Sequence, residues 1–340
     1  MSFTDQSERR GGFARRAFLV LGLGIAGFLI AGFLWATSVP GQSYAGPAST
    51  PDNPALAARL REHVTILAQD RRNIDRPQTV IATKAYISQQ LEALGYSVRQ
   101  QEVIAPASNL IVRIDAKSPG SKTLILGAHY DTAGSSPGAD DNASGVAALI
   151  EIARLLKPMT GRSKLNVELV FYANEEPPYF KTGAMGSYVH AISIDDPNAV
   201  VGMISLESMG YFSDEDGSQN YPFPLSLRYT DTGNFIAFVG TTASRDFLRG
   251  SIDEFRKSAR IPSVGGTAPS IVQGVDWSDH WGYTKVGIPA FMITDTAPFR
   301  NPNYHRTSDT PDTLDYNRLA LVTEGIGAML EARLSPVESD

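Results

Sequence analysis

The sequence has no cysteine among its 340 residues. Disulfides, thiolate nucleophiles and cysteine-ligated zinc fingers are therefore excluded, and any metal must be held by His, Asp or Glu. Basic residues are not in excess, since the formal net charge is −6, so nucleic acid is not an expected partner. Histidine is also scarce, which shortens the list of candidate ligands to His63, His129, His190, His280 and His305.

One uncharged run near the start of the chain is long enough to cross a membrane. Residues 17–39, AFLVLGLGIAGFLIAGFLWATSV, follow the stretch RRGGFARR, so they fit an anchor whose basic side, residues 1–16, stays in the cytoplasm. A cleavable export signal is the alternative, because residues 15–16 resemble a twin-arginine motif and SYA at 43–45 could be cleaved. The remaining chain is expected outside the cytoplasm. It would be held at the cytoplasmic membrane, periplasmic or extracellular, or be secreted after cleavage near Ala45.

The rest of the chain alternates between two hydrophobic patterns. Residues 40–53, with three prolines among small polar residues, are typical of a linker, and residues 54–335 form the expected folded domain. Helical spacing of apolar residues predicts helices at 54–70, 79–95, 143–157, 182–192, 244–258 and 315–333. Extended or continuous apolar runs predict strands at 97–103, 109–115, 122–129, 164–173, 200–206 and 288–294. This alternation predicts an α/β fold, with a mostly parallel sheet covered by helices on both faces.

Side chains that can bind metals follow four of the predicted strands. They are His129 with Asp131, Glu175 with Glu176, Glu207, and His305. In open α/β sheets the ligand site lies at the carboxyl ends of the strands, so these side chains are expected to meet there. They could form a metal centre with nitrogen and oxygen ligands. The alternative for Glu175-Glu176, taken alone, is an exposed acidic turn.

The loop GAHYDTAGSSPGADDNASG, residues 127–145, indicates a division of roles among its polar residues. His129 and Asp131 project to the same side of an extended segment, so His129 can bind a metal while Asp131 accepts its other ring N–H. Asp141 stands at the start of a predicted helix, where a carboxylate could bridge two cations. Glu175 and Glu176 point in different directions, so one could be a ligand and the other a general base.

Together these motifs resemble the co-catalytic di-zinc aminopeptidases, whose wider family includes glutamate carboxypeptidase, the transferrin receptor and glutaminyl cyclase. The resemblance covers about 120 to 310. It implies a zinc-exopeptidase (phosphorylase/hydrolase-like) architecture of three α/β/α layers with a mixed, mostly parallel sheet. The matching segments, in the family's order, are HYD at 129–131, GADDNASG at 138–145, NEE at 174–176, SLESMG at 205–210, SDH at 278–280 and YH at 304–305.

The resemblance implies two zinc ions and a ligand set. His129 and Glu207 would bind one zinc, and Glu176 and His305 would bind the other. Asp141 would bridge the two ions, and a cis peptide is expected after it. The family more often has Asp at the position of Glu207, whose longer side chain could change the metal spacing or occupancy.

The resemblance also implies the remaining roles. Glu175 would be the general base and Tyr304 an oxyanion donor. Asp131 would orient the histidine ligand, and Asp140 would shape the turn. His280 is expected either to touch the active site or simply to pack. The implied activity is hydrolysis of N-terminal residues from peptides with a free amine.

Three alternatives remain open from the sequence. Glutaminyl cyclase uses one zinc on the same scaffold, and a binding module could have kept the fold without catalysis. A carboxypeptidase needs a basic pocket, for which the candidates are Arg228, Arg260, Arg300 and Arg306. His63 and His190 are predicted to be structural or solvated. The loops at 208–233 and 259–277 are expected to shape the substrate pocket, while the oligomeric state and the preferred side chain are open.

Overall fold

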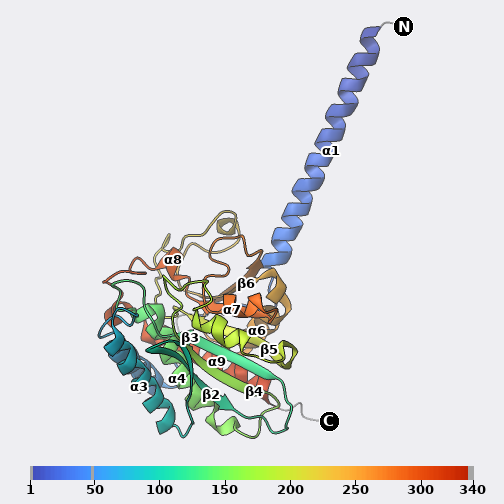
Figure 1. The fold of residues 1–340 in the computed structure, drawn as a ribbon. Coiled ribbons are helices and arrows are strands. Elements are labelled where there is room, and N and C mark those ends of the chain that lie inside the picture. Colours follow the sequence, from blue (N-terminus) through green and yellow to red (C-terminus); the bar gives the residue numbers. More distant parts are fainter. Residues whose placement is uncertain (1–2, 47–49, 336–340) are drawn as a thin grey trace. The chain divides into compact units, whose positions relative to one another are not determined.

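The computed structural model describes residues 3–46 and 50–335, with side chains from residue 18 onward, and divides the chain into two units (Figure 1). The first unit, residues 1–38, contains helix α1 (Phe3–Thr37). Its stretch Phe18–Thr37 has 20 residues and a mean hydropathy of 2.3, which is long and apolar enough to cross a membrane. A signal sequence passes the same criterion. The second unit, residues 39–340, is the folded domain.

The second unit is built on one mixed sheet of eight strands in the order β1-β2-β4-β3-β5-β8-β6-β7. Strands β3, β4, β5 and β8 run parallel to one another. The antiparallel pairings are β1–β2, β2–β4 and β6–β8, and β7 pairs in parallel with β6. The bounds are β1 Arg99–Ile104, β2 Ala107–Ile114, β3 Thr123–His129, β4 Asn166–Tyr172, β5 Val200–Glu207, β6 Ile236–Thr241, β7 Ser263–Ala268 and β8 Ala290–Thr294.

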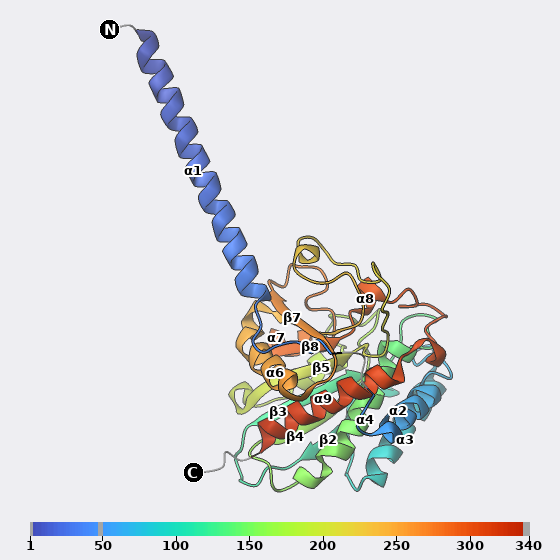
Figure 2. The same ribbon diagram turned by 180° about the vertical axis from the view of Figure 1, so that it is seen from behind.

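Helices cover both faces of the sheet, so the domain has three layers. The central strands are apolar on both sides because alternate residues point to opposite faces: Leu124 and Leu126 pack into one core, and Ile125 into the other. The larger core lies under α2 (Pro54–Leu67), α3 (Pro77–Ala93), α4 (Gly145–Leu156), α6 (Arg245–Ser258) and α9 (Tyr316–Leu334), and Figure 2 shows α9 running across this face. The smaller core lies under α5 (Gly186–Ile192) and α7 (His280–Lys285).

The predicted α/β/α fold with a mostly parallel mixed sheet is confirmed. Each of the six predicted strands and six predicted helices corresponds to an element, although α5 starts at Gly186 rather than at 182. The prediction of a loop at 259–277 is wrong in part, because it contains β7. Strand β6 and the short helices α7 and α8 (Ala297–Arg300) were not predicted. The sheet is therefore larger at one edge than the sequence suggested.

The predicted linker, residues 40–53, lies partly against the domain. Arg256 of α6 donates hydrogen bonds to the carbonyls of Pro40 and Gly41, at 2.9 and 3.0 Å. The backbone N–H of Ser263 donates to the Ser43 hydroxyl at 2.8 Å. The start of this segment is thus fixed along β7 by specific hydrogen bonds.

Candidate metal centre

The loop between β3 and α4 places the first metal-binding side chains. The loop begins after His129 at the end of β3 and leads into α4 through a turn at Ala139–Ser144. This turn has the predicted cis peptide between Asp141 and Asn142. Gly138 has a φ of 62°, and a Cβ at this position would lie 2.3 Å from the carbonyl oxygen of Asp141. Only glycine fits such a close approach of backbone to backbone.

Asn142 connects this turn to the end of β5. Its side-chain amide donates to the carbonyl of Leu206 at 2.8 Å, and its Oδ1 accepts the N–H groups of Gly145 and Ser208, each at 3.1 Å. The residue between Leu206 and Ser208 is Glu207. The side chain of Asn142 therefore fixes Asp141 and Glu207 relative to each other, although they are far apart in sequence.

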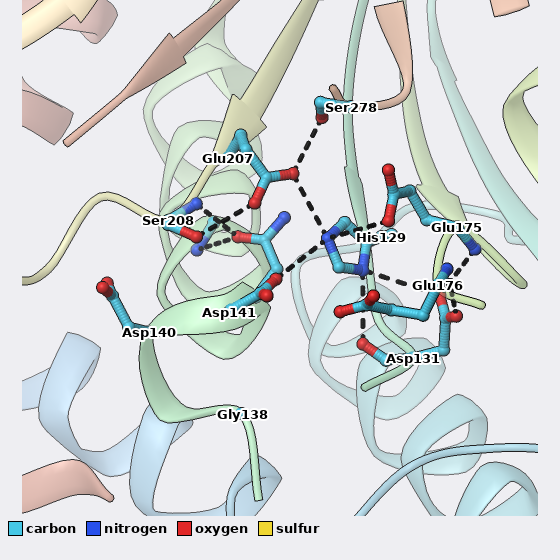
Figure 3. A network of polar contacts seen from close by, with 12 residues as sticks. His129, Asp131, Gly138, Asp140, Asp141, Glu175, Glu176, Glu207, Ser208 and Ser278 are labelled. Carbon is cyan, nitrogen blue, oxygen red and sulfur yellow. Dashed lines mark hydrogen bonds and ion pairs between the residues drawn. The ribbon is translucent and has the colours of Figure 1, made fainter. Parts of the chain in front are cut away.

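The first candidate metal group comprises His129, Asp141 and Glu207 (Figure 3). The Nε2 atom of His129 lies 3.3 Å from Oδ1 of Asp141 and 3.2 Å from Oε2 of Glu207. Two hydroxyls orient the Glu207 carboxylate: Ser208 donates to Oε1 at 2.9 Å and Ser278 to Oε2 at 2.8 Å. The side chains come from the ends of β3 and β5 and from the turn before α4.

The second candidate group comprises Asp141, Glu176 and His305. The Nε2 atom of His305 lies 3.1 Å from Oδ2 of Asp141 and 3.3 Å from Oε1 of Glu176. Asp141 thus offers Oδ1 to the first group and Oδ2 to the second. A carboxylate shared in this way can bridge two cations. The structure brings together all five residues for which the sequence predicted a ligand role.

Several ligand atoms of these two groups have no hydrogen-bond partner in the protein and could bind a metal instead. Nε2 of His129, Oδ1 of Asp141 and Oε1 of Glu176 are buried and have no hydrogen-bond partner. Buried polar atoms without partners are rare and costly in proteins. Imidazole nitrogens with carboxylate oxygens are also an ordinary donor set for zinc. Divalent cations would satisfy these atoms.

The electrostatics of the centre point the same way. Burial raises the pKa of Glu176 to about 8, and the neighbouring Asp141 adds to this effect. Burial acts to lower the pKa of His305, but the facing carboxylates of Asp141 and Glu176 outweigh it and raise the pKa to about 10. Without a metal, Glu176, His129 and His305 therefore hold their protons more tightly than usual. A bound cation would take the place of those protons.

Glu175 and Tyr304 flank the two groups. Oε2 of Glu175 lies 3.9 Å from Nε2 of His129, and burial raises the pKa of Glu175 well above its usual range. The ring of Tyr304 stacks on that of His305, with centroids 3.9 Å apart and planes 20° apart. Burial and the nearby carboxylate of Asp141 raise the pKa of Tyr304 well above its usual range. Its hydroxyl therefore stays protonated and can donate a hydrogen bond.

Asp131 acts chiefly on Glu175 and Glu176 rather than on the histidine. Its Oδ1 accepts the backbone N–H of Glu175 and its Oδ2 that of Glu176, each at 3.0 Å. The Nδ1 atom of His129 lies 3.2 Å from the Asp131 carbonyl and 3.6 Å from its carboxylate. The prediction that this carboxylate accepts the ring N–H therefore needs correction: the backbone carbonyl is the nearer acceptor. Both contacts still orient the His129 ring.

Asp140 joins the turn to two other loops. Its carboxylate accepts the N–H of Gly210 at 2.9 Å and the side-chain amide of Asn301 at 2.7 Å. Asp309 was not predicted, yet its carboxylate accepts the N–H groups of Asp140 and Asp141, at 2.9 and 3.2 Å. The predicted shaping role of Asp140 agrees with these contacts. The sequence signal for Asp309 was its position in the SDT segment four residues after His305.

Arg72 was not predicted from the sequence as part of the site, yet it supports the loop that carries the ligands. Its fully buried side chain donates to the carbonyls of Tyr130, Pro137 and Gly138 in the β3–α4 loop and to that of Leu67 in α2. Burial lowers its pKa to about 10, against the opposing field of Asp309 and other acids. The guanidinium thus holds the backbone of the ligand-bearing loop and adds a positive charge near it.

The other candidates of the sequence lie outside the two metal groups. His280 is buried, and its Nε2 lies 3.0 Å from the carbonyl of Val275, so it anchors the loop before α7. His190 contacts the hydroxyl of Tyr283 at 2.6 Å in the smaller core. Arg300 is buried and donates to Gln219 and to the carbonyl of Phe235, at 2.7 and 2.9 Å. These contacts are structural.

The fold and the paired His/carboxylate groups define the class of this molecule as an α/β/α protein with a candidate centre for two metal ions. Residues 109–330 match the model of Peptidase family M28, and the chain belongs to that family. The matched range includes both candidate metal groups. The family assignment thus rests on the same part of the chain as the site.

Two relatives illustrate the range of similarity. The chain is 38% identical over 328 residues to the "Uncharacterized protein YfbL" of Escherichia coli strain K12, covering 92% of this chain and 97% of that protein. It is 30% identical over 240 residues to the "Probable lipoprotein aminopeptidase LpqL" of Mycobacterium tuberculosis, covering 65% of this chain but 44% of that protein. The chain thus spans less than half of the mycobacterial relative.

Solved structures with this fold include different enzymes. The LapA aminopeptidase of Legionella pneumophila superposes with a TM-score of 0.66 at 18% identity, covering 86% of this chain and 79% of that one. Glutaminyl cyclase of Bacteroides thetaiotaomicron superposes with a TM-score of 0.60 at 21% identity, covering 80% and 96%. At such identities the likeness concerns the fold alone, so the activity must be argued from the site.

Proposed function

We propose that this protein is a zinc-dependent aminopeptidase that hydrolyses N-terminal residues from peptides. His129, Asp141 and Glu207 would hold one zinc ion, and Asp141, Glu176 and His305 a second. The observation that carries the proposal is the shared position of Asp141, whose two oxygens face the two histidines at 3.3 and 3.1 Å. A single-metal centre would not need both groups.

Two zinc ions would polarise the scissile carbonyl and lower the pKa of the attacking water. Glu175 would accept the proton of that water and deliver it to the leaving amine, as a buried carboxylate of raised pKa is suited to do. Tyr304 would donate its phenolic hydrogen to the oxygen on which negative charge develops. The turn held by Asp131 keeps Glu175 in place beside the zinc ligand Glu176.

The charge of the site supports an exopeptidase that recognises a free amine. In the described part of the chain, the cationic side chains within 4.0 Å of the Asp141, Glu176 and Glu207 carboxylates are His129 and His305. Carboxylates beside the zinc ions could accept hydrogen bonds from a substrate ammonium group, whereas a terminal carboxylate would find no arginine or lysine at this distance. The contacts of Arg300 with Gln219 and Phe235 also leave it unsuited to a carboxypeptidase pocket.

The proposed setting is the outer side of a membrane. Helix α1 contains the apolar stretch Phe18–Thr37, which fits an anchor or an export signal. We expect the domain outside the cytoplasm, held by this helix or released after cleavage near Ala45. The substrates would then be peptides of the periplasm or the extracellular space.

The test combines a metal count with a substrate panel on the full chain in detergent. Two zinc ions per chain, with cleavage of aminoacyl anilides and of peptides that have free N-termini but not of N-acetylated peptides, are expected. One metal together with cyclisation of N-terminal glutamine would show a glutaminyl cyclase instead. Release of C-terminal residues would show a carboxypeptidase, and tight peptide binding without any product would show a binding module.

A further inference from the structure

The loop Tyr221–Thr230, YPFPLSLRYT, exposes apolar side chains on the surface of the second unit. Phe223 is 81% exposed and Leu227 is 75% exposed. Residues 217–230 contain no aspartate or glutamate, although Asp216 and Asp231 flank them directly. Two large apolar side chains exposed on one short loop without acidic residues are typical of a contact surface rather than of ordinary solvent-facing loop.

This loop is fixed beside β7. The hydroxyl of Tyr229 donates to the carbonyl of Gly265 at 2.8 Å, and the ring of Tyr221 packs against that of Tyr229 with centroids 5.8 Å apart. Leu227 is two residues from Tyr229, so the chain can place them at most about 7 Å apart. Figure 2 shows β7 at the edge of the sheet, next to α6. The apolar loop is therefore held close to that edge.

The same strand receives the chain that comes from the apolar helix. A Cβ built on Gly265 would lie 3.3 Å from Cγ1 of Val39, and Ser263 donates its N–H to the Ser43 hydroxyl at 2.8 Å. Arg256 binds the carbonyls of Pro40 and Gly41. Residues 39–43 are thus bound to the domain surface, and they begin two residues after Thr37, the last residue of α1.

The length of the chain then limits where this surface can lie. The 20 residues of Phe18–Thr37 rise by about 30 Å as a helix, which equals the hydrocarbon thickness of a bilayer. Val39 follows Thr37 by two residues, so its Cα lies within about 8 Å of the helix end. When the helix spans a membrane, this covalent connection keeps Val39, the first residue of the bound segment, near the lipid headgroups.

We propose that the loop Tyr221–Thr230 contacts the lipid bilayer that α1 crosses, with Phe223 and Leu227 inserted at the interface. The exposed Arg228 beside these apolar side chains matches the composition that membrane interfaces favour, whereas Tyr221 and Tyr229 hold the loop to the domain. This inference concerns the surface of the domain and does not depend on the proposed peptidase activity.

The absence of cysteine makes a site-specific test direct. Phe223→Cys and Leu227→Cys are made singly in the full chain, and each thiol is labelled with a fluorophore sensitive to polarity. The proteins are reconstituted one chain at a time into phosphatidylcholine nanodiscs, with and without nitroxide-labelled lipid. Ile192→Cys is the matched control, because Ile192 is 56% exposed at the end of α5, near the opposite edge of the sheet.

The expected result is a blue-shifted emission at positions 223 and 227 that nitroxide lipid quenches, with neither effect at position 192. Emission and quenching equal to those of the control at both loop positions would overturn the proposal. A blue shift without quenching by nitroxide lipid would overturn it too, because the loop would then be covered by protein. Retained thermal unfolding temperatures of the labelled variants establish that the domain is folded in each measurement.

Discussion

Two buried clusters of this protein combine histidine with carboxylate, yet they are built in opposite ways. In the metal centre, carboxylates outnumber histidines, and atoms of His129, Asp141 and Glu176 have no hydrogen-bond partner. The second cluster, here called the helix-layer cluster, is made by Arg59, His63, Tyr86, Glu151 and Arg154. In it, both carboxylate oxygens of Glu151 and both ring nitrogens of His63 have a partner. The metal centre therefore has buried ligand atoms that a bound cation could satisfy, whereas the helix-layer cluster already contains the cations Arg59 and Arg154.

The difference lies in the arginines. Oε2 of Glu151 accepts a hydrogen bond from Arg59 at 2.8 Å, and Oε1 lies 3.2 Å from Nε2 of His63. Hydrogen bonds from His63 and Arg59 lower the pKa of Glu151 to about 2, although burial opposes them. In the metal centre burial prevails and the pKa of Glu176 rises to about 8. Residue type alone therefore does not distinguish the two clusters; they differ in whether the buried carboxylate already has cationic partners.

The largest expected effect separates catalysis from structure. Glu175→Gln should lower kcat for aminoacyl anilides by about 10²–10⁴-fold, because the amide cannot accept the proton of the attacking water. Zinc content and the thermal unfolding temperature should stay unchanged. Glu331→Gln is the matched control, since it makes the same chemical change at an exposed position of α9. Equal kcat in the Glu175 variant and the natural protein would show that the proposed base is wrong.

The next effect concerns stability. Glu151→Gln should lower the free energy of unfolding by about 3 kcal/mol at pH 7, because Arg59 and Arg154 lose a buried anion. The pKa of Glu151 is lowered from 4.5 to about 2 in the folded protein. Its contribution is therefore fully present above pH 4.5 and is lost as the pH falls towards 2. Chemical denaturation at several pH values checks this, and a difference that does not shrink below pH 4 would contradict it.

At the metal centre, the corresponding substitution is expected to raise the free energy of unfolding rather than lower it. In protein stripped of metal by a chelator, Glu176→Gln should raise the free energy of unfolding at pH 8 by roughly 2 kcal/mol, because it removes a crowded buried charge. A raised pKa means that the folded state holds the proton more tightly, so its ionisation destabilises as the pH rises through the range 4.5 to about 8. The gain should vanish below pH 4.5. With zinc present the same substitution should destabilise, which the thermal unfolding temperature reports.

The smallest predicted effect tests the support of one ligand. Ser278→Ala removes the hydroxyl that donates to Oε2 of Glu207 at 2.8 Å. Loss of such a supporting hydrogen bond should weaken zinc binding by about tenfold at the His129 group, with little change at the His305 group. Competition with a chelator of known affinity resolves the two sites. Equal weakening at both sites, or none, would exclude this role for Ser278.

The fold could be predicted because it depends on short-range patterns, whereas the expected ligand set came from the resemblance to a known family. Continuous apolar runs mark β3 and β4 as strands buried on both faces, and metal-binding side chains stand at their ends. The edge of the sheet was harder to predict. The segment Ser263–Ala268, SVGGTA, has two glycines and little apolar character, so its place in the sheet comes from pairing with β6. A six-residue apolar run such as Ile236–Thr241 is likewise ambiguous by itself.

The supporting residues were missed for a different reason. Arg72 binds backbone carbonyls, which every residue has, so no partner in the sequence marks its role. Asp131 was predicted to serve His129 because a two-residue spacing indicates a shared side. Its main partners, the N–H groups of Glu175 and Glu176, lie 44 and 45 positions away in sequence. Such contacts follow only from the folded chain.

The hydrogen bonds from the backbone of Glu175 and Glu176 to Asp131 limit how this site can be redesigned. Its two oxygens hold consecutive amides, so the proposed base and a proposed ligand form one rigid piece of backbone. A substitution meant to retune the metal through the Glu176 backbone will therefore displace Glu175 as well. Independent adjustment has to come from Glu207, whose carboxylate is oriented by the separate hydroxyls of Ser208 and Ser278.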